Sequence, residues 1–467
     1  MQLRDAAASP GRTTRRPTAV ALLAALAALW PLMRASAQTS EPPRWIPQFL
    51  GAQFTLIAQY LPRFHALYSG PNSLTDQGDR EATHTYGIYF GARLAGRLQA
   101  FLDLEMARGA AVGNAVGLGG ITNGDVIRQG AVHLGEGPYL ARGYLRYVVP
   151  LSGELDTASR AMDQLPGPEP VARLEVKLGK LALTDDFDQN RYANSTRLQF
   201  CDWGLFNNTA WDYAADTRGY SYGAVIGWVH RRWALRVGSF LMPTFANGDV
   251  LDRDVARARA DNVELTLQPT HVGTIVRALA YQNHGRMGIY LAALAQAQRT
   301  GQAPDIVADD QPGRRKWGVA LNVEQPLADG GETGAFLRLG WNDGRTEDFA
   351  FSEVDRHLSA GVQVAGTLWH RGQDHLAIAF LRHGLSSEHR AYLADGGKGF
   401  LLGDGAGFSP SGQWLNYGPE EVFESYYRAQ LGRYVEITPD VQFVAHPGYN
   451  RDRGPVALAA LRLNVHY

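Results

Sequence analysis

The chain has 467 residues and a formal net charge of only −1. We expect no nucleic-acid partner, because the arginine-rich run at 253–259 is interleaved with Asp252, Asp254 and Asp261 and is not a basic patch. The single cysteine, Cys201, excludes an internal disulfide, and we expect it to be an inert, packed thiol.

The start of the chain has the features of a secretory signal peptide. Three arginines at 12–16 precede an apolar stretch rich in Ala, Leu and Val, and Ala35-Ser36-Ala37 is typical of a cleavage site. The apolar stretch is too short for a spanning helix. We therefore predict that residues 1–37 are removed after export and that residues 38–467 form one domain.

Segments that alternate between apolar and polar residues recur along the rest of the chain. In one of them, Val263, Leu265 and Leu267 alternate with Glu264 and Thr266. Many such segments are about as long as the ~9–11 residues of a tilted membrane-spanning strand. Spanning strands are predicted near residues 52–60, 84–94, 97–107, 139–150, 171–181, 219–229, 233–242, 261–268, 273–282, 315–325, 334–342, 358–368, 374–383, 422–432, 434–444 and 456–467.

Residues 287–297 are a further candidate strand, which the lengths of the loops exclude. Bacterial barrels made of one chain have an even number of strands, with short turns on one side and long loops on the other. Omitting this alanine-rich segment produces that pattern. The one exception is residues 151–170, an unusually long connection on the side of the short turns. The omitted segment suits a short helix better than a strand. We predict an all-β fold, a 16-stranded antiparallel transmembrane β-barrel with long external loops, short periplasmic turns and periplasmic termini.

The last predicted strand has two different faces. Leu461 and Leu463 lie on one face, Arg462 and Asn464 lie on the other, and the strand ends at Tyr467. We expect the apolar face to contact lipid, the polar face to line a wet lumen, and the terminal ring to join an interfacial aromatic girdle. The alternative is an edge strand of a soluble sandwich.

Several stretches of the chain resemble a known family. They include DQNRYAN at 188–194, QFCDW at 199–203, NNTAWDY at 207–213, NHGRMGIY at 283–290 and HPGYNRDRGP at 446–455. In these residues the chain resembles the carbohydrate-selective outer-membrane porins of the OprB type, although Tyr467 stands where Phe is usual and His446 where Asn is expected. The resemblance implies a 16-stranded barrel in the bacterial outer membrane for passive diffusion of monosaccharides and polyols into the periplasm.

The polar faces of the predicted strands carry charges of both signs. One-signed rings of charge favour ions, whereas a mixed wall suits neutral solutes with many hydroxyl groups. The alternative is that most of these charges pair across strands and only keep the lumen wet. Candidate pore-lining or solute-contacting residues on the strands and in one loop are Arg142, Arg146, Arg173, Glu175, Trp203, Trp211, Asp212, Asp216, Arg218, Arg338, Glu424 and Arg428.

The predicted loop 182–218 is the best candidate for a constriction. It is long and carries four aromatic residues close to carboxylates, amides and an arginine. Aromatic faces can contact the C–H faces of a sugar ring while polar groups bond its hydroxyls, the mixture typical of specific sites. The alternative is that the aromatics only pack the loop against the barrel wall.

No catalytic residue, metal site or cofactor is predicted, and the chain is not expected to be an enzyme. Asp186, Asp188 and Asn190 begin like an EF-hand, but Arg191 stands where glycine is required, which leaves at most a weak Ca²⁺ contact. Expected partners are small neutral sugars, outer-membrane lipid and the barrel-assembly machinery, with a homo-oligomer as a further option and no nucleic acid. The alternative functions are a polysaccharide export channel and a barrel enzyme of the lipase or deacylase type.

Overall fold

The computed structural model describes residues 46–125, 134–404 and 415–467. The predicted signal peptide, residues 1–37, lies outside these residues and stays a prediction, as does the start of the predicted domain at residue 38.

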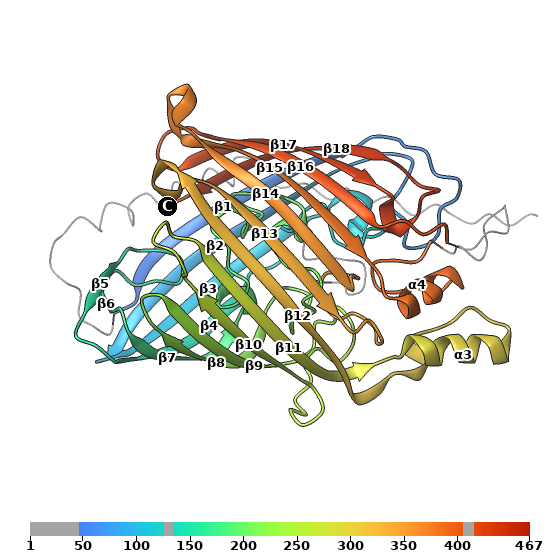
Figure 1. Ribbon diagram of the computed structural model, residues 1–467, viewed down its shortest axis with the longest axis horizontal. Coiled ribbons are helices and arrows are strands. Elements are labelled where there is room, and N and C mark those ends of the chain that lie inside the picture. The colour runs from blue at the N-terminus through green and yellow to red at the C-terminus, as the bar shows by residue number, and fades with distance from the viewer. Residues whose placement is uncertain (1–45, 126–133, 405–414) are drawn as a thin grey trace, which may run out of the picture. The chain divides into compact units, whose positions relative to one another are not determined.

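Within the described residues, sixteen strands close into one antiparallel barrel (Figure 1). Successive barrel strands pair with each other, and the first pairs with the last, so that Leu56 lies opposite Leu463. The predicted fold class is confirmed, with all sixteen strands in the predicted places. The barrel strands are β1 (Gln48–Leu61), β2 (Asp79–Ala95), β3 (Leu98–Gly109), β4 (Tyr139–Pro150), β7 (Arg173–Leu181), β8 (Ser221–Val229), β9 (Trp233–Leu241), β10 (Arg259–Leu267), β11 (Ile275–Met287), β12 (Gln311–Ala328), β13 (Thr333–Asn342), β14 (Arg356–Gly366), β15 (Arg371–Gly384), β16 (Glu420–Gln430), β17 (Val435–Ala445) and β18 (Val456–His466).

The segment that the loop lengths excluded from the barrel is helical, as predicted. It forms α3 (Tyr290–Thr300), which ends at Gly301 in the left-handed conformation that glycine adopts without strain. Two shorter α-helices are α2 (Trp203–Phe206) and α4 (Ser387–Ala394). No helix in the described part of the chain is long and apolar enough to cross a bilayer.

The two ends of the barrel differ in the length of their connections. One end, here called the short-turn end, has turns such as 96–97 and 230–232, and the opposite long-loop end carries α3 and α4 (Figure 1). That the short-turn end and the chain termini are periplasmic and the long loops external stays a prediction, made from the usual arrangement of such barrels. The predicted exception is also present, because residues 151–172 hold a hairpin of β5 (Leu155–Ala158) and β6 (Gly167–Pro170).

Burial alternates along the strands as the sequence predicts. In β18, Arg462 and Asn464 are fully buried toward the inside of the barrel, whereas Leu461 is 53% exposed. Trp228 and Trp317 are among the other large apolar side chains that the barrel leaves exposed. An apolar outer band is the surface that lipid requires, and a closed barrel leaves no strand edge unpaired in it.

A charge on this outer band is expected to destabilise the barrel. Leu461→Arg should cost about 2–4 kcal/mol of folding free energy if the residue lies near the bilayer midplane. The matched control is Thr266→Arg, because Thr266 borders a polar cavity inside the barrel. Urea titration of folding into lipid vesicles measures both changes, and equal losses at the two positions would show that the faces are assigned incorrectly.

Candidate pore and solute-binding cavities

The connection between β7 and β8, residues 182–220, folds into the barrel and is here called the inner loop. It begins with a 3-10 turn, Leu183–Asp185, and later forms the single turn of α2, whose first residues are capped because Asp202 accepts the N–H of Gly204 at 2.8 Å. Nearly all its side chains from residue 199 to 217 are buried. The inner loop therefore fills part of the lumen, as its length predicts.

Arg338 of β13 holds the first half of the inner loop. Its Nε lies 3.0 Å from Asp188 Oδ2, and its other nitrogens donate to the carbonyl oxygens of Ala193 at 2.7 Å and Leu205 at 3.1 Å. Asn322 donates to Asp188 Oδ1 at 2.6 Å. Arg338 was predicted to face the lumen, and the structure places its guanidinium under the inner loop, where Asp188 and several carbonyl groups surround it.

The opposite wall makes a second set of contacts with the inner loop. Glu424 of β16 accepts the backbone N–H groups of Cys201 at 2.5 Å and Asp202 at 2.9 Å. Arg462 donates to the carbonyl oxygens of Thr196 at 2.7 Å and Gln199 at 2.6 Å. Because β13 and the β16–β18 wall both bind the loop, the loop bridges the lumen.

The tryptophans of the inner loop are buried in its packing. Trp211 is 1% exposed, its indole N–H donates to Asn262 at 2.9 Å, and its ring packs edge-on against Phe187. Trp203 is 9% exposed and lies 4.8 Å from Phe351, centroid to centroid. Both tryptophans are therefore packing residues of the loop in this structure, as the alternative to solute contact requires. Direct contact of either tryptophan with a solute stays a prediction.

Asp216 and Arg218 lie where the inner loop returns to the wall. Asp216 accepts the backbone N–H groups of Arg218 at 3.0 Å and Tyr220 at 3.1 Å, and it lies 3.7 Å from the ammonium of Lys180. The guanidinium of Arg218 stacks 4.1 Å above the ring of Tyr139. Both candidates thus hold a turn beside the barrel wall.

A row of charged side chains follows β4 and β7 toward the short-turn end. Arg142 lies 3.3 Å from Asp103 and 2.6 Å from Asp185. Arg146 lies 2.6 Å from Glu175, which is also 3.3 Å from Arg173. Arg146, Arg173 and Glu175 are therefore neighbours, Arg142 has acidic partners of its own, and the predicted pairing of charges across strands is present.

Arg428, the remaining candidate on a strand, lies on the other side of the barrel. Its guanidinium is hydrogen-bonded to His375 at 2.7 Å and lies 3.8 Å from Glu436. His375 borders a cavity of about 580 Å³ that also includes Glu332 and His466. Residues of two short turns, Glu332 between β12 and β13 and Arg433 between β16 and β17, also line this cavity, which places it at the short-turn end.

A cavity of about 240 Å³ lies between the inner loop and the wall formed by β9–β11. Its lining combines carboxylate, guanidinium, amide and hydroxyl groups. The sequence did not single out this cavity, because the inner loop completes it. The lining residues are Asp185, Asp186, Gln189, His230, Arg231, Arg232, Trp233, Ala234, Arg236, Glu264, Thr266, Gln268, Ile275 and Arg277.

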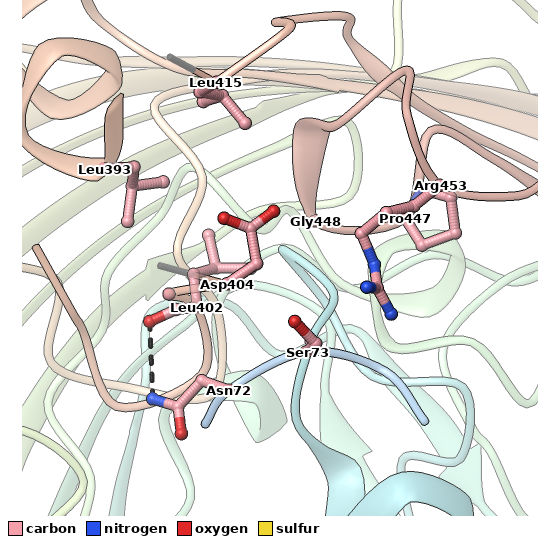
Figure 2. Close-up of a pocket in the computed structure, with 11 residues that line it drawn as sticks. Asn72, Ser73, Leu393, Leu402, Asp404, Leu415, Pro447, Gly448 and Arg453 are labelled. Atoms are coloured by element: carbon pink, nitrogen blue, oxygen red, sulfur yellow. Dashed lines mark hydrogen bonds between the residues drawn. The ribbon is translucent and has the colours of Figure 1, made fainter. Parts of the chain in front are cut away.

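The long-loop end has a much smaller cavity, where several loop segments meet (Figure 2). Asn72 donates to the carbonyl oxygen of Leu402 at 3.3 Å, and Arg453 donates to Ser69 Oγ at 3.0 Å. The free space is about 10 Å³, which is room for about one water molecule. The loops are thus too tightly packed here for a sugar to occupy this cavity.

Buried charges fasten the inner loop to the long loops. Asp212 accepts the backbone N–H groups of Phe349 and Ala350, both at 2.9 Å, and lies 3.5 Å from the ammonium of Lys316. Lys316 also pairs with Asp348. The candidate Asp212 is therefore a link between two loops.

His389 of α4 lies in the same region. Its ring nitrogens are 3.2 Å from Asp355 and 3.7 Å from Glu353. Burial lowers the pKa of His389, but the hydrogen bonds and charges of these carboxylates outweigh burial and raise it overall. Burial raises the pKa of Glu347, which accepts the N–H of Gly288, to about 8.

These shifts predict that α4 and its neighbours are held less firmly at high pH. A raised pKa of His389 contributes stability that is fully present below its unfolded pKa of about 6.5 and is lost as the pH rises through the folded value. The raised pKa of Glu347 acts in the same direction, because between its ordinary value of 4.5 and about 8 the unfolded carboxyl ionises while the folded one stays protonated, so stability falls across this range. Backbone amides of α4 should exchange hydrogen faster at about pH 8.5 than at about pH 6, after correction for intrinsic rates. Amides of β10 are the internal control, and equal protection of α4 at both pH values would contradict the prediction.

Two buried triads have donor atoms close enough for a metal ion: Asp348, Asp355 and His389, and Cys201, Glu424 and Asp440. In the first triad, Asp348 pairs with Lys316, and in the second, Glu424 accepts backbone N–H groups. The EF-hand-like residues also have protein partners, since Asp186 pairs with Lys177, Asp188 with Arg338, and Asn190 with Asn322. The absence of a cofactor stays a prediction.

Comparisons with known proteins bear on both the fold and the family. The family described as "Carbohydrate-selective porin, OprB family" matches residues 165–467. The high-pH structure of Pseudomonas putida OprB is similar with a TM-score of 0.65 and 12% identity, over 92% of this chain and 100% of that chain. The outer membrane channel DcaP of Acinetobacter baumannii is similar with a TM-score of 0.48 and 10% identity, over 90% and 97%. At 12% identity the first similarity shows a shared fold, and no curated protein sequence matches the chain.

Proposed function

The chain belongs to the OprB family of carbohydrate-selective porins, and from this we propose that it is a passive channel for monosaccharides and related polyols. Family and fold are those of an outer-membrane sugar porin, a channel rather than an enzyme. We further propose that the solutes are as small as monosaccharides and that residues of the inner loop and the barrel wall contact them.

The observation that carries the proposal is the polar cavity of about 240 Å³ beside the inner loop. Guanidinium and amide N–H groups in its lining can donate to hydroxyl oxygens, and carboxylates can accept from hydroxyl hydrogens. A neutral polyol needs donors and acceptors together, because each of its hydroxyl groups must replace its hydrogen bonds to water with hydrogen bonds to the channel wall. Because a channel must also release its solute, we expect several such contacts, each of them weak.

Arg236 is the cavity residue that we expect to contact the solute most directly. Its nearest carboxylate, Glu175, is 4.0 Å away, and its side chain, which lines the cavity, is 21% exposed. A donor in this position gains a partner when a hydroxyl group arrives. Hydrogen bonds to a charged group are worth about 1.5–3 kcal/mol, so its loss should weaken solute binding by about tenfold or more.

The test is the block of single-channel ion current by added sugars and polyols in planar bilayers. We expect glucose and mannitol to block the current reversibly and Arg236→Met to need about tenfold higher concentrations for half-block. Arg433→Met is the matched control, because Arg433 lines the separate cavity of about 580 Å³. If monosaccharides neither block nor permeate the unaltered channel, the proposed solute class is wrong.

The export of an acidic polysaccharide is the second candidate function. A channel for a polyanion is expected to present a basic lumen. Here Asp185, Asp186 and Glu264 line the same cavity as the arginines, and this mixture favours neutral solutes. Dextran sulfate added to the bilayer chamber should therefore block the current no better than uncharged dextran of equal size.

A further inference from the structure

The long connection at the short-turn end, residues 151–172, folds back against the inside of the barrel mouth. It is here called the mouth segment, and it contains the hairpin of β5 and β6 (Figure 1). The other connections at this end are far shorter. Its length is well beyond the ~2–5 residues that usually join two paired antiparallel strands.

An apolar side chain anchors the mouth segment to the barrel wall. Leu165 is almost fully buried in a cluster with Leu50, Phe101 and Tyr144. The wall has a glycine opposite it, since a Cβ at Gly91 would lie 3.1 Å from the Leu165 side chain. Burying a leucine side chain contributes about 1.5–3 kcal/mol, which is enough to hold a short segment in place.

Polar contacts fix the segment on both sides of this anchor. Arg93 of β2 donates to the carbonyl oxygen of Pro166 at 2.8 Å, and the Tyr144 hydroxyl donates to Asp163 at 3.2 Å. Asp163 also lies 3.5 Å from Arg142. The segment therefore brings its acidic side chains to the charged row of β4 and β7.

Glu169 joins the pair of arginines in this row. It forms an ion pair with Arg146 and lies 3.2 Å from Arg173, while Glu175 of the wall contacts the same two arginines. Arg146 and Arg173 thus face two carboxylates, one supplied by a strand and one by the mouth segment, while Arg236 lies farther off, 4.0 Å from Glu175. The side chains of Arg146, Arg173 and Glu169 stay 13–19% exposed, so they are within reach of water in the lumen.

Asp163 is placed differently from Glu169. It lies 3.5 Å from Arg142, a guanidinium that already has Asp103 at 3.3 Å and Asp185 at 2.6 Å. Glu169 instead contacts two arginines that share one other carboxylate, Glu175. Glu169 is therefore the residue of the mouth segment whose loss would leave an unbalanced positive charge in the lumen.

We propose that Glu169 is a selectivity-determining residue: the mouth segment carries it into the barrel, where it balances Arg146 and Arg173 and keeps the path open to neutral solutes without favouring anions. Fixed charges that line a narrow path decide which ions pass. Without Glu169, the single carboxylate Glu175 faces Arg146, Arg173 and the more distant Arg236, and the path gains one positive charge. This inference rests on the proposed function, because it concerns the selectivity of the same channel.

The test compares ion selectivity of the full-length channel before and after Glu169→Gln, measured as the reversal potential across a KCl gradient. The ratio of chloride to potassium permeability should rise about tenfold, because one unit charge acting over ~6 Å in water-like surroundings favours chloride about threefold and disfavours potassium about threefold. Glu154→Gln is the matched control, because Glu154 belongs to the same segment but pairs with Arg231 in an exposed ion pair. It should leave the ratio unchanged.

A double variant separates charge balance from damage to the fold. Glu169→Gln combined with Arg146→Gln restores equal numbers of the two charges and should return the permeability ratio toward its original value. An unchanged ratio in Glu169→Gln, or an equal rise in Glu154→Gln, would overturn the inference. Sugar block of the unaltered channel is recorded in the same bilayers, so failure of the proposed solute class is visible independently of the ion measurement.

Discussion

Replacing Asp188 by alanine is expected to release the inner loop from the barrel wall and to raise single-channel conductance. Asp188 is the carboxylate that Arg338 faces at 3.0 Å, and it also accepts the backbone N–H of Asn208 at 2.9 Å. The variant leaves the guanidinium of Arg338 buried without its counter-charge. Breaking a buried ion pair by removing one partner costs about 3–5 kcal/mol.

The measurement pairs the urea dependence of unfolding with conductance in planar bilayers. Asp249→Ala is the control, since Asp249 is exposed in the loop between β9 and β10. Adding Arg338→Met to Asp188→Ala should recover part of the lost stability, because the stranded charge is then gone. The higher conductance should persist in the double variant, as the loop still lacks its clamp. If Asp188→Ala alters neither quantity, the contacts of Glu424 and Arg462 hold the loop without it.

The barrel could be predicted from the sequence because the alternation along a strand is local information. Leu461 and Arg462 belong to opposite faces by their position in the strand alone, whatever the rest of the chain does. The helical character of α3 followed in the same way from composition and from the even number of strands. These inferences needed no knowledge of which segments meet in space.

The roles of individual lumen residues could not be predicted, because they depend on what the inner loop covers. Arg338 and Arg236 have the same pattern in the sequence, each a basic residue on the inner face of a strand. The structure places Arg338 under the loop, with Asp188 as its partner, and leaves Arg236 at the edge of a cavity. The mouth segment presents the same difficulty, since its length is visible in the sequence but its return to the lumen depends on the fit of Leu165 against Gly91.

Replacing Trp211 by alanine is expected to loosen the inner loop from within. The side chain is among the largest that the barrel buries completely, and it supports the loop against Phe187 and Asn262. Truncating a buried tryptophan costs about 3–5 kcal/mol. Because the loop forms one side of the polar cavity, sugar block should weaken and ion conductance should change at the same time.

Two further variants distinguish this packing role from direct contact between Trp211 and a sugar. Trp211→Phe keeps most of the ring and loses the hydrogen bond to Asn262, so it should cost only about 1 kcal/mol beyond the smaller ring and largely preserve sugar block. Trp317→Ala is the control on the outer surface, where the side chain is half exposed and packs against Trp341. It should leave block unchanged. Direct contact instead predicts that Trp211→Ala weakens sugar block while conductance and the urea midpoint stay as they are. That outcome would mean that the tryptophan reaches the solute in a conformation of the inner loop in which its ring is uncovered.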